Sequence, residues 1–481
     1  MYKIPDDVWR MVVEFATHTL SQVLTLQQID SHFRRLMLNP IMVTHISIQL
    51  DDLHAINNMG SWRFGVHYFK CMELPAIAPL GLLAHLPAVR CLDLSCGKFD
   101  SENFQVAIMS LHNLQRLDLS FCRQLTQLSN LPTTLRELDV MCCTRLVSIP
   151  PMPNLERLEA SNCLRLVTLP DLPALLHVDL GYSSTVIDSA LDSMGSLRHL
   201  KIGHDTAPDP QRLTNLDSLC LVDCNFEREW VCAPLTNLTS LTLVFVSYRR
   251  DHDLTCLSTL TALRRLHLET GVSDDNLTPL EQLVNLKHLV LASELISDDG
   301  LVSVGKMSSL ETLYINNCRR LQITGEGLLA LVPLIRLRSL HLSECYGVSY
   351  QGLSVLTQLR TLCIDNDVNL NDRWPITLEE EWIDQMVRQD DLQPLTLLHN
   401  LTTLELLYCR VKSLRWLNQI PRLAVLVVKG CHLTRRGLWD LTPCHTPSVI
   451  LGECSRAKLG KDVGRFLKCI PHLTFECENE S

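Results

Sequence analysis

A short apolar spacing recurs along almost the whole chain and limits its possible folds more than any other feature. The pattern x-x-apolar-x-apolar occurs nineteen times in 481 residues. Clear copies begin at Leu114, Leu155, Leu216 and Leu310, and in nine copies a cysteine stands five residues after the middle apolar position. Such a chain does not divide into ordinary globular domains, because each unit buries its apolar face only against the next.

The repeat predicts one short strand in every 20 to 27 residues, a period typical of leucine-rich repeats. The middle and last apolar residues face the core, and the residues between them face the opposite side. We therefore predict an α/β fold, a leucine-rich repeat solenoid of horseshoe form with a parallel sheet on its concave side. It is predicted to span residues 43–481, and its second repeat is read with Phe69 as the first apolar residue.

Cysteine usage indicates the compartment. Of the 20 cysteines, nine stand at the ninth repeat position: Cys122, Cys143, Cys163, Cys224, Cys318, Cys345, Cys409, Cys431 and Cys454. A small apolar side chain is needed there under the turn that leaves the strand, so we predict buried, unpaired thiols. The sequence has no CxxC pair and no zinc-ligand spacing, and free thiols in this number favour a reducing compartment. Without a secretory signal or a membrane-length apolar run, we expect a cytoplasmic protein that can also be nuclear.

Charge and motifs exclude several classes of function. The net charge is -10, and Lys and Arg cluster only in pairs such as Arg249-Arg250, which argues against nucleic acid as the main partner. No GxSxG, Gly-rich phosphate loop or HExxH occurs, so we expect a protein that is not an enzyme and that needs no cofactor. His177, His199, His204, His267 and His288 lie near the predicted strands, but their spacing does not predict a metal site.

The repeats are of two kinds. Between Leu114 and Leu197 prolines occupy the predicted convex side, so extended segments are expected there. From Leu263 onward, a Ser or Thr precedes the apolar segment at a spacing that predicts helix N-caps. The five predicted N-cap residues are Ser273, Ser297, Thr324, Ser349 and Thr434.

One long gap separates two repeats, and residues 369–394 within it carry two Arg and seven Asp or Glu, a sum of -5. Thr377 and Glu380 form a predicted capping box, and Trp382 and Met386 lie on one apolar helical side. Two roles remain open for this insertion helix: packing on the convex side, or docking a partner.

The first 42 residues follow a different pattern, with Pro5 at a predicted helix start and three short helices that end before Pro40. This segment resembles an F-box. The matching apolar and aromatic positions are Ile4, Pro5, Val8, Val12, Leu20, Leu24, Phe33 and Leu36. The resemblance implies that these residues bind a Skp-type adaptor of a cullin-RING (SCF-type) ubiquitin ligase, with the repeats recognising its substrate. The alternative is a helical cap on the first repeat of a stand-alone interaction scaffold.

The fifth repeat position faces the concave side and carries five consecutive carboxylates: Asp93, Asp118, Asp139, Glu159 and Asp179. Like charges on neighbouring strands repel, so they are either relieved by neighbours such as Arg116 and Arg157 or receive a basic segment of a partner protein. Leu-Asp-Leu is also simply a frequent sequence at this place in the repeat. Aromatic residues predicted on the rim of the same face are candidate contacts with a partner: Phe121, Tyr182, Phe245 and Tyr408.

Overall fold

The computed structural model describes residues 46–47, 68–183 apart from 72 and 77, 193–203, 209–224, 232–244, 254–269, 271–316, 323–344, 350–366, 390–431, 433–441 and short stretches within 446–476. Two compact units divide the chain, Met1–Arg228 and Glu229–Ser481. In these described ranges no helix is long and apolar enough to cross a membrane. The predicted F-box-like helices and the insertion helix with Trp382 and Met386 lie outside them.

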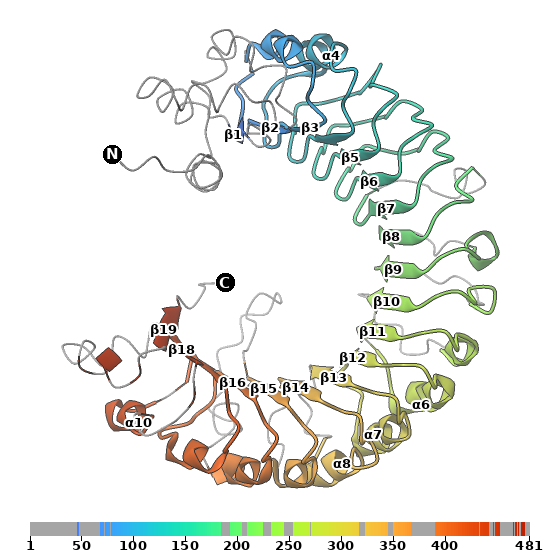
Figure 1. Ribbon diagram of the computed structural model, residues 1–481. Coiled ribbons are helices and arrows are strands. Elements are labelled where there is room, and N and C mark those ends of the chain that lie inside the picture. Colours follow the sequence, from blue (N-terminus) through green and yellow to red (C-terminus); the bar gives the residue numbers. More distant parts are fainter. Residues whose placement is uncertain are drawn as a thin grey trace, which may run out of the picture. The chain divides into compact units, whose positions relative to one another are not determined.

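The first unit is built on short parallel strands, each paired with the next along the chain (Figure 1). They are β1 (Ile46–Ser47), β2 (Tyr68–Lys70), β3 (Cys91–Asp93), β4 (Arg116–Asp118), β5 (Glu137–Asp139), β6 (Arg157–Glu159), β7 (His177–Leu180), β8 (His199–Gly203) and β9 (Ser218–Val222). The register aligns Phe69 with Leu92, the middle apolar residue of its repeat. The prediction that Phe69 is a first apolar residue is therefore wrong by three positions.

Behind these strands the first unit carries little helix. Its described helices are the 3-10 helix η4 (Leu80–His85), α4 (Ser101–Ile108) and the 3-10 helix η5 (Pro210–Arg212). From Leu111 to Ser183 the described backbone contains no helix, and a lone parallel bridge joins Gln127 to Ser148. The predicted extended backing of the proline-containing repeats is thus confirmed.

The described residues of the second unit form ten further strands, again parallel and paired in chain order. They are β10 (Ser240–Val244), β11 (Arg265–Glu269), β12 (His288–Ala292), β13 (Thr312–Asn316), β14 (Ser339–Ser343), β15 (Thr361–Asp365), β16 (Thr403–Leu407), β17 (Val425–Lys429), β18 (Ser448–Gly452) and β19 (Leu473–Glu476). Together with the repeat pattern, this register identifies the fold as a leucine-rich repeat solenoid.

Helical turns back the strands of the second unit (Figure 1). The α-helices whose bounds lie in the described residues are α6 (Asp274–Leu277), α7 (Asp298–Gly305), α8 (Gly325–Leu329) and α10 (Arg435–Trp439). The 3-10 helices are η6 (Thr255–Thr259), η7 (Thr278–Gln282), η8 (Tyr350–Val355), η9 (Asp390–Leu397) and η10 (Arg415–Gln419).

Predicted N-caps begin the α-helices. Ser273 forms a capping box with Asn276, and Ser297, Thr324 and Thr434 accept hydrogen bonds from amides of the first helical turn. These four predictions are confirmed, and Ser349 lies outside the described residues.

An aspartate in the first helical turn also joins one repeat to the next. Asp298 accepts hydrogen bonds from the backbone N–H and the hydroxyl of Thr324, both at 2.7 Å. Asp274 contacts Ser297 in the same way, at 2.9 and 2.5 Å. A Cβ added at Gly327 would lie 2.0 Å from Oδ1 of Asp298, so the glycine leaves room for this link.

The position-nine cysteines are buried in the core. Cys122, Cys143 and Cys163 donate hydrogen bonds to main-chain carbonyl oxygens of the preceding repeat, at 3.3, 3.1 and 3.1 Å. Burial raises the pKa of Cys122 and of Cys163 to about 12. The prediction of buried thiols that form no disulfide is confirmed for six cysteines: Cys122, Cys143, Cys163, Cys224, Cys409 and Cys431. The other three lie outside the described residues: Cys318, Cys345 and Cys454.

Candidate protein-binding face

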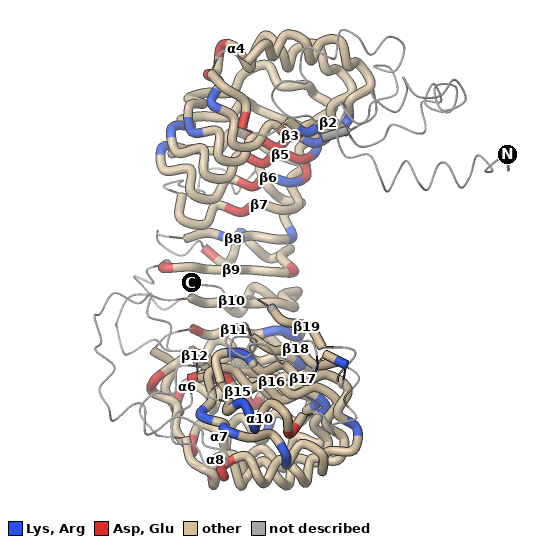
Figure 2. Tube along the Cα trace, turned by 90° about the vertical axis from the view of Figure 1, so that its left-hand side faces the viewer, with Lys and Arg blue, Asp and Glu red and all other residues tan. Residues whose placement is uncertain are grey.

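Five acidic side chains form one row across neighbouring strands of the first unit. The strand register places them side by side, in the order Asp93, Asp118, Asp139, Glu159, Asp179. Figure 2 shows acidic residues gathered along β3 to β7. Neighbouring strands lie about 4.8 Å apart, so adjacent carboxylates of this acidic row repel one another unless they are neutralised.

Four of the five carboxylates also hold the turn that follows their strand. One side-chain oxygen accepts a hydrogen bond from the backbone N–H two residues further on, at 2.8 to 3.0 Å, in Asp93, Asp118, Asp139 and Asp179. The next residue then has a left-handed backbone, as at Phe121 (φ 60°) and Tyr182 (φ 58°). This is a physical reason for the frequency of Leu-Asp-Leu in the repeat, because a short carboxylate stabilises such a turn.

A lysine neutralises each end of the acidic row. Lys70 is in register with Asp93, and Lys201 is in register with Asp179. The ammonium nitrogen of Lys70 is 2.7 Å from Oδ2 of Asp93, and that of Lys201 is 2.9 Å from Oδ2 of Asp179. The hydrogen bond to Asp93 raises the pKa of Lys70.

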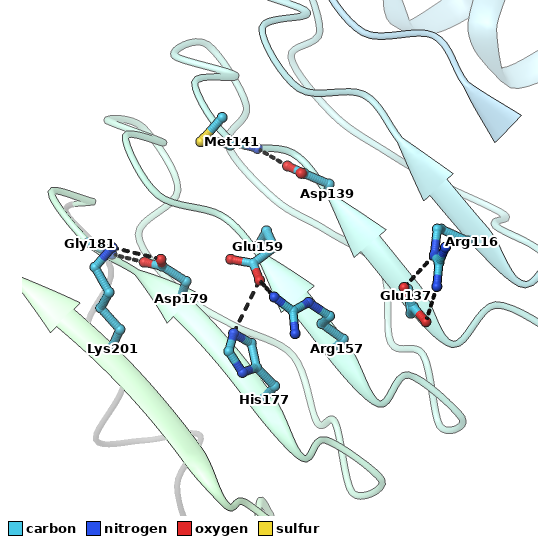
Figure 3. Close-up of polar contacts among 10 residues, drawn as sticks. All are labelled: Arg116, Glu137, Asp139, Met141, Arg157, Glu159, His177, Asp179, Gly181 and Lys201. Carbon is cyan, nitrogen blue, oxygen red and sulfur yellow. Dashed lines mark hydrogen bonds and ion pairs between the residues drawn. The ribbon is translucent and has the colours of Figure 1, made fainter. Parts of the chain in front are cut away.

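Glu159 has two basic neighbours. Nη2 of Arg157 lies 2.5 Å and Nε2 of His177 3.1 Å from Oε1 of Glu159 (Figure 3). Burial raises the pKa of Glu159, but the hydrogen bond from His177 and the charge of Arg157 outweigh burial and hold that pKa below its ordinary value. The prediction that Arg157 relieves the row is confirmed. For Arg116 it is wrong, because Arg116 stands in register with Glu137 and pairs with it, Nη2 to Oε1 at 2.8 Å.

The middle of the row keeps its charge. Within the described part of the chain, neither Asp118 nor Asp139 has an ion pair. Burial raises the pKa of Asp139 to about 6, and the carboxylates of Asp118 and Glu159 add to this rise, against the hydrogen bond from the Met141 amide. At pH 7 Asp139 is mostly ionised, and it takes up a proton as the pH falls through 6.

The predicted rim aromatics are divided between the two units. Phe121 and Tyr182 are both in the first unit, with exposed fractions of 38% and 41%, in the turns after β4 and β7. Tyr408 is half-buried in the second unit, where its ring lies against Gly430. Phe245 lies outside the described residues. Phe121 is therefore the predicted aromatic that stands nearest in sequence to the unpaired carboxylates.

The same strand position in the second unit is mostly uncharged. Its register runs through Thr242, His267, Val290, Tyr314, His341, Cys363, Glu405, Val427 and Ile450. The rings of Tyr314 and His341 stack with centroids 3.8 Å apart and planes 12° apart. Burial lowers the pKa of His341. The sequence analysis missed this stack, for which the available signal was that the two residues hold the same position in consecutive repeats.

Two histidines of the first unit, His177 and His199, lie beside the acidic row, and His204 lies outside the described residues. The rings of His177 and His199, in register on β7 and β8, have centroids 5.6 Å apart. Among the residues that the structure describes, no three His, Cys, Asp or Glu side chains are placed to hold a metal ion together.

Comparison with known proteins gives structural similarity only. No protein-family model matches the sequence, and no curated protein matches it. A leucine-rich repeat protein of Leptospira interrogans aligns over 92% of this chain and 98% of its own, with 16% identity and a TM-score of 0.45. An internalin of Listeria monocytogenes aligns over 83% of this chain and 89% of its own, with 17% identity and a TM-score of 0.35.

Proposed function

We propose that this protein is a non-enzymatic binding scaffold, in which the strand face of the first unit receives a basic segment of another protein. The observation that carries the proposal is the distribution of charge along the acidic row. Lys70 and Lys201 balance its two ends, whereas Asp118 and Asp139 stand in register on adjacent strands without an ion pair in the described residues.

The spacing of the two carboxylates favours arginine over lysine. A guanidinium presents several N–H donors in a planar fork and bridges two acceptors, whereas an ammonium acts as a single point of charge. The expected separation of about 4.8 Å between β4 and β5 suits such a bridge. Burial, together with the charges of Asp118 and Glu159, raises the pKa of Asp139 to about 6. This carboxylate loses its charge as the pH decreases through 6, so the affinity for a cation is expected to fall over the same range.

The test selects peptides from a random displayed library on the full-length protein. We expect the selected peptides to contain arginine. They should bind at least ~10-fold more weakly to the Asp118→Asn, Asp139→Asn variant, because such a decrease in affinity corresponds to the loss of about one charge-assisted contact. Asp171→Asn is the matched control, because Asp171 is exposed in the extended segment between β6 and β7. Selected peptides without basic residues, or equal affinity for the double variant, would contradict the proposal.

The F-box resemblance supports a second, finer function for the same chain. We propose that residues 1–42 bind a Skp-type adaptor, so that the scaffold presents its partner to a cullin-RING ubiquitin ligase. The supporting observation is the run from Ile4-Pro5 to Leu36, which also includes Phe33. The stand-alone scaffold, with these residues as a helical cap, is the alternative.

Adaptor binding is tested by co-purification of the tagged full-length chain with Skp-type and cullin subunits. The Pro5→Ala, Leu24→Asp variant should no longer bind the adaptor. Its melting temperature and its affinity for the selected peptides should equal those of the parent chain. The cap alternative predicts no adaptor with the parent chain and a lower melting temperature for the variant. A parent chain that captures no Skp-type subunit would rule out the ligase function and leave the binding scaffold intact.

A further inference from the structure

Two thiols of neighbouring repeats lie in direct contact in the second unit. Cys232 lies in the segment that leads into β10, and Cys256 lies in η6, which leads into β11. The Sγ atoms are 2.8 Å apart, with Cys232 as the hydrogen-bond donor. The two residues are 24 positions apart in the chain, which is about the length of one repeat. The contact therefore joins equivalent sides of consecutive repeats.

This arrangement differs from that of the position-nine cysteines. Cys122 and Cys143 also belong to consecutive repeats, but each donates its hydrogen bond to a main-chain carbonyl oxygen. The sulfur of Cys232 instead faces another sulfur, at a distance about 0.8 Å longer than the roughly 2.05 Å of a disulfide bond. The two sulfur atoms would have to approach by only about 0.8 Å to reach bonding distance.

We propose that Cys232 and Cys256 form a modification site, at which a low-molecular-weight disulfide oxidises the two thiols to one disulfide bond between consecutive repeats. The site is separate from the acidic row, which lies in the other unit, and does not depend on the proposed function.

Exposure determines the order of the two steps. Cys232 is fully buried, whereas Cys256 is half-buried and accessible to a small reagent. The hydrogen bond to Cys256 and burial both raise the pKa of Cys232, so Cys232 remains a thiol and is the poorer first nucleophile.

The exchange is balanced in two steps. The thiolate of Cys256 attacks one sulfur of glutathione disulfide, and the reagent's S–S bond breaks, releasing one glutathione that takes up a proton. Cys232 then loses its proton and attacks the Sγ atom of Cys256. The mixed S–S bond breaks, and the second glutathione leaves and takes up that proton. Two protein thiols are oxidised, and one disulfide is reduced to two thiols.

The test treats the full-length protein with glutathione disulfide, alkylates the remaining thiols under denaturing conditions and maps peptides by mass without reduction. We expect a linked peptide pair containing Cys232 and Cys256 that disappears after reduction, while Cys122 and Cys143 remain alkylated. The melting temperature should rise on oxidation, because the bond closes a loop of one repeat. Alkylation of both Cys232 and Cys256 after oxidation, or equal linking of the control pair, would overturn the site.

Single variants test the order of attack. Cys232→Ser should leave Cys256 as a stable glutathione adduct, whereas Cys256→Ser should leave Cys232 alkylated, because a buried thiol does not reach the reagent. A glutathione adduct on Cys232 in the folded Cys256→Ser protein would overturn this order. The half-buried position of Cys256 makes Cys256→Ser the milder change, and its melting temperature checks that the chain has folded.

Discussion

The two units use one repeat but place their aspartates differently. In the first unit, aspartates such as Asp118 and Asp139 hold the turns after the strands and therefore lie on the strand face. In the second unit, Asp274 and Asp298 hold the starts of the helices and link one repeat to the next on the opposite side. The corresponding strand positions there carry residues such as Val290 and Tyr314. The position of the stabilising carboxylate thus decides whether the strand side or the helical side of a repeat carries the charge.

The largest expected effect tests the close packing behind the strands of the second unit. A Cβ added at Gly437 in α10 would lie 1.9 Å from the backbone oxygen of Lys412, which is part of the main chain and cannot rotate away. Gly437→Ala should therefore reduce the free energy of unfolding by about 3 kcal/mol in chemical denaturation. Gly81→Ala in η4 of the first unit is the control, since no atom lies within 4 Å of its added Cβ. Equal stability of the two variants would contradict this difference in packing.

The link between helical repeats should have the next largest effect. Asp298→Ala removes two hydrogen bonds to Thr324, and we expect a loss of about 1 to 2 kcal/mol in the free energy of unfolding. Asp299→Ala changes the adjacent, exposed carboxylate and should have a much smaller effect. If both variants lose the same stability, the inter-repeat link does not contribute beyond the general charge of the helix start.

Substitution of Asp139, in the middle of the acidic row, should stabilise the first unit. Asp139 binds its proton more tightly in the folded chain than when unfolded, so its ionisation lowers the free energy of unfolding above about pH 6 and has no effect below its ordinary pKa. Asp139→Asn keeps an acceptor for the Met141 amide and should gain about 1 kcal/mol at pH 7, a value reduced for partial exposure.

The matched control is Asp179→Asn, which removes the partner of Lys201 and should lower stability at pH 7. Denaturation of both variants at pH 7 and pH 4 checks the sign of each effect. A destabilised Asp139→Asn protein at pH 7, or a gain that persists at pH 4, would show that Asp139 is not an uncompensated charge.

The smallest effect concerns the ring stack of the second unit. A double-mutant cycle on Tyr314→Ala and His341→Ala should give a coupling energy of about 0.5 to 1 kcal/mol. A second cycle on Thr361 and Thr403, which are in register on β15 and β16, should give a smaller coupling. By NMR, His341 should titrate below the ordinary pKa of histidine, because burial disfavours its charged form. A coupling that does not exceed that of the control pair would mean that the ring contact adds nothing to stability.

The sequence allowed prediction of features that repeat with a fixed period. The strands, the buried cysteines, the acidic row and the N-caps at Ser297 and Thr324 each depend on residues a few positions apart. The two lysines at the ends of the row were not predicted as its partners. Lys70 was missed because Phe69 was placed three positions out of register, and Lys201 because its pairing with Asp179 depends on side-chain reach across strands. The contact of Cys232 with Cys256 was missed because neither residue occupies a repeat-defining position.

The turn bonds of the acidic row have a consequence for recognition. Oδ1 of Asp118 and of Asp139 is already held by a backbone amide, so these side chains are fixed before any ligand arrives. A cation bound between them would not have to immobilise flexible side chains, a step that usually weakens association by about 0.5 to 1.5 kcal/mol for each rotamer-rich residue. The same hydrogen bonds that end the strands therefore preorganise the surface, and folding the repeat also sets its geometry for binding.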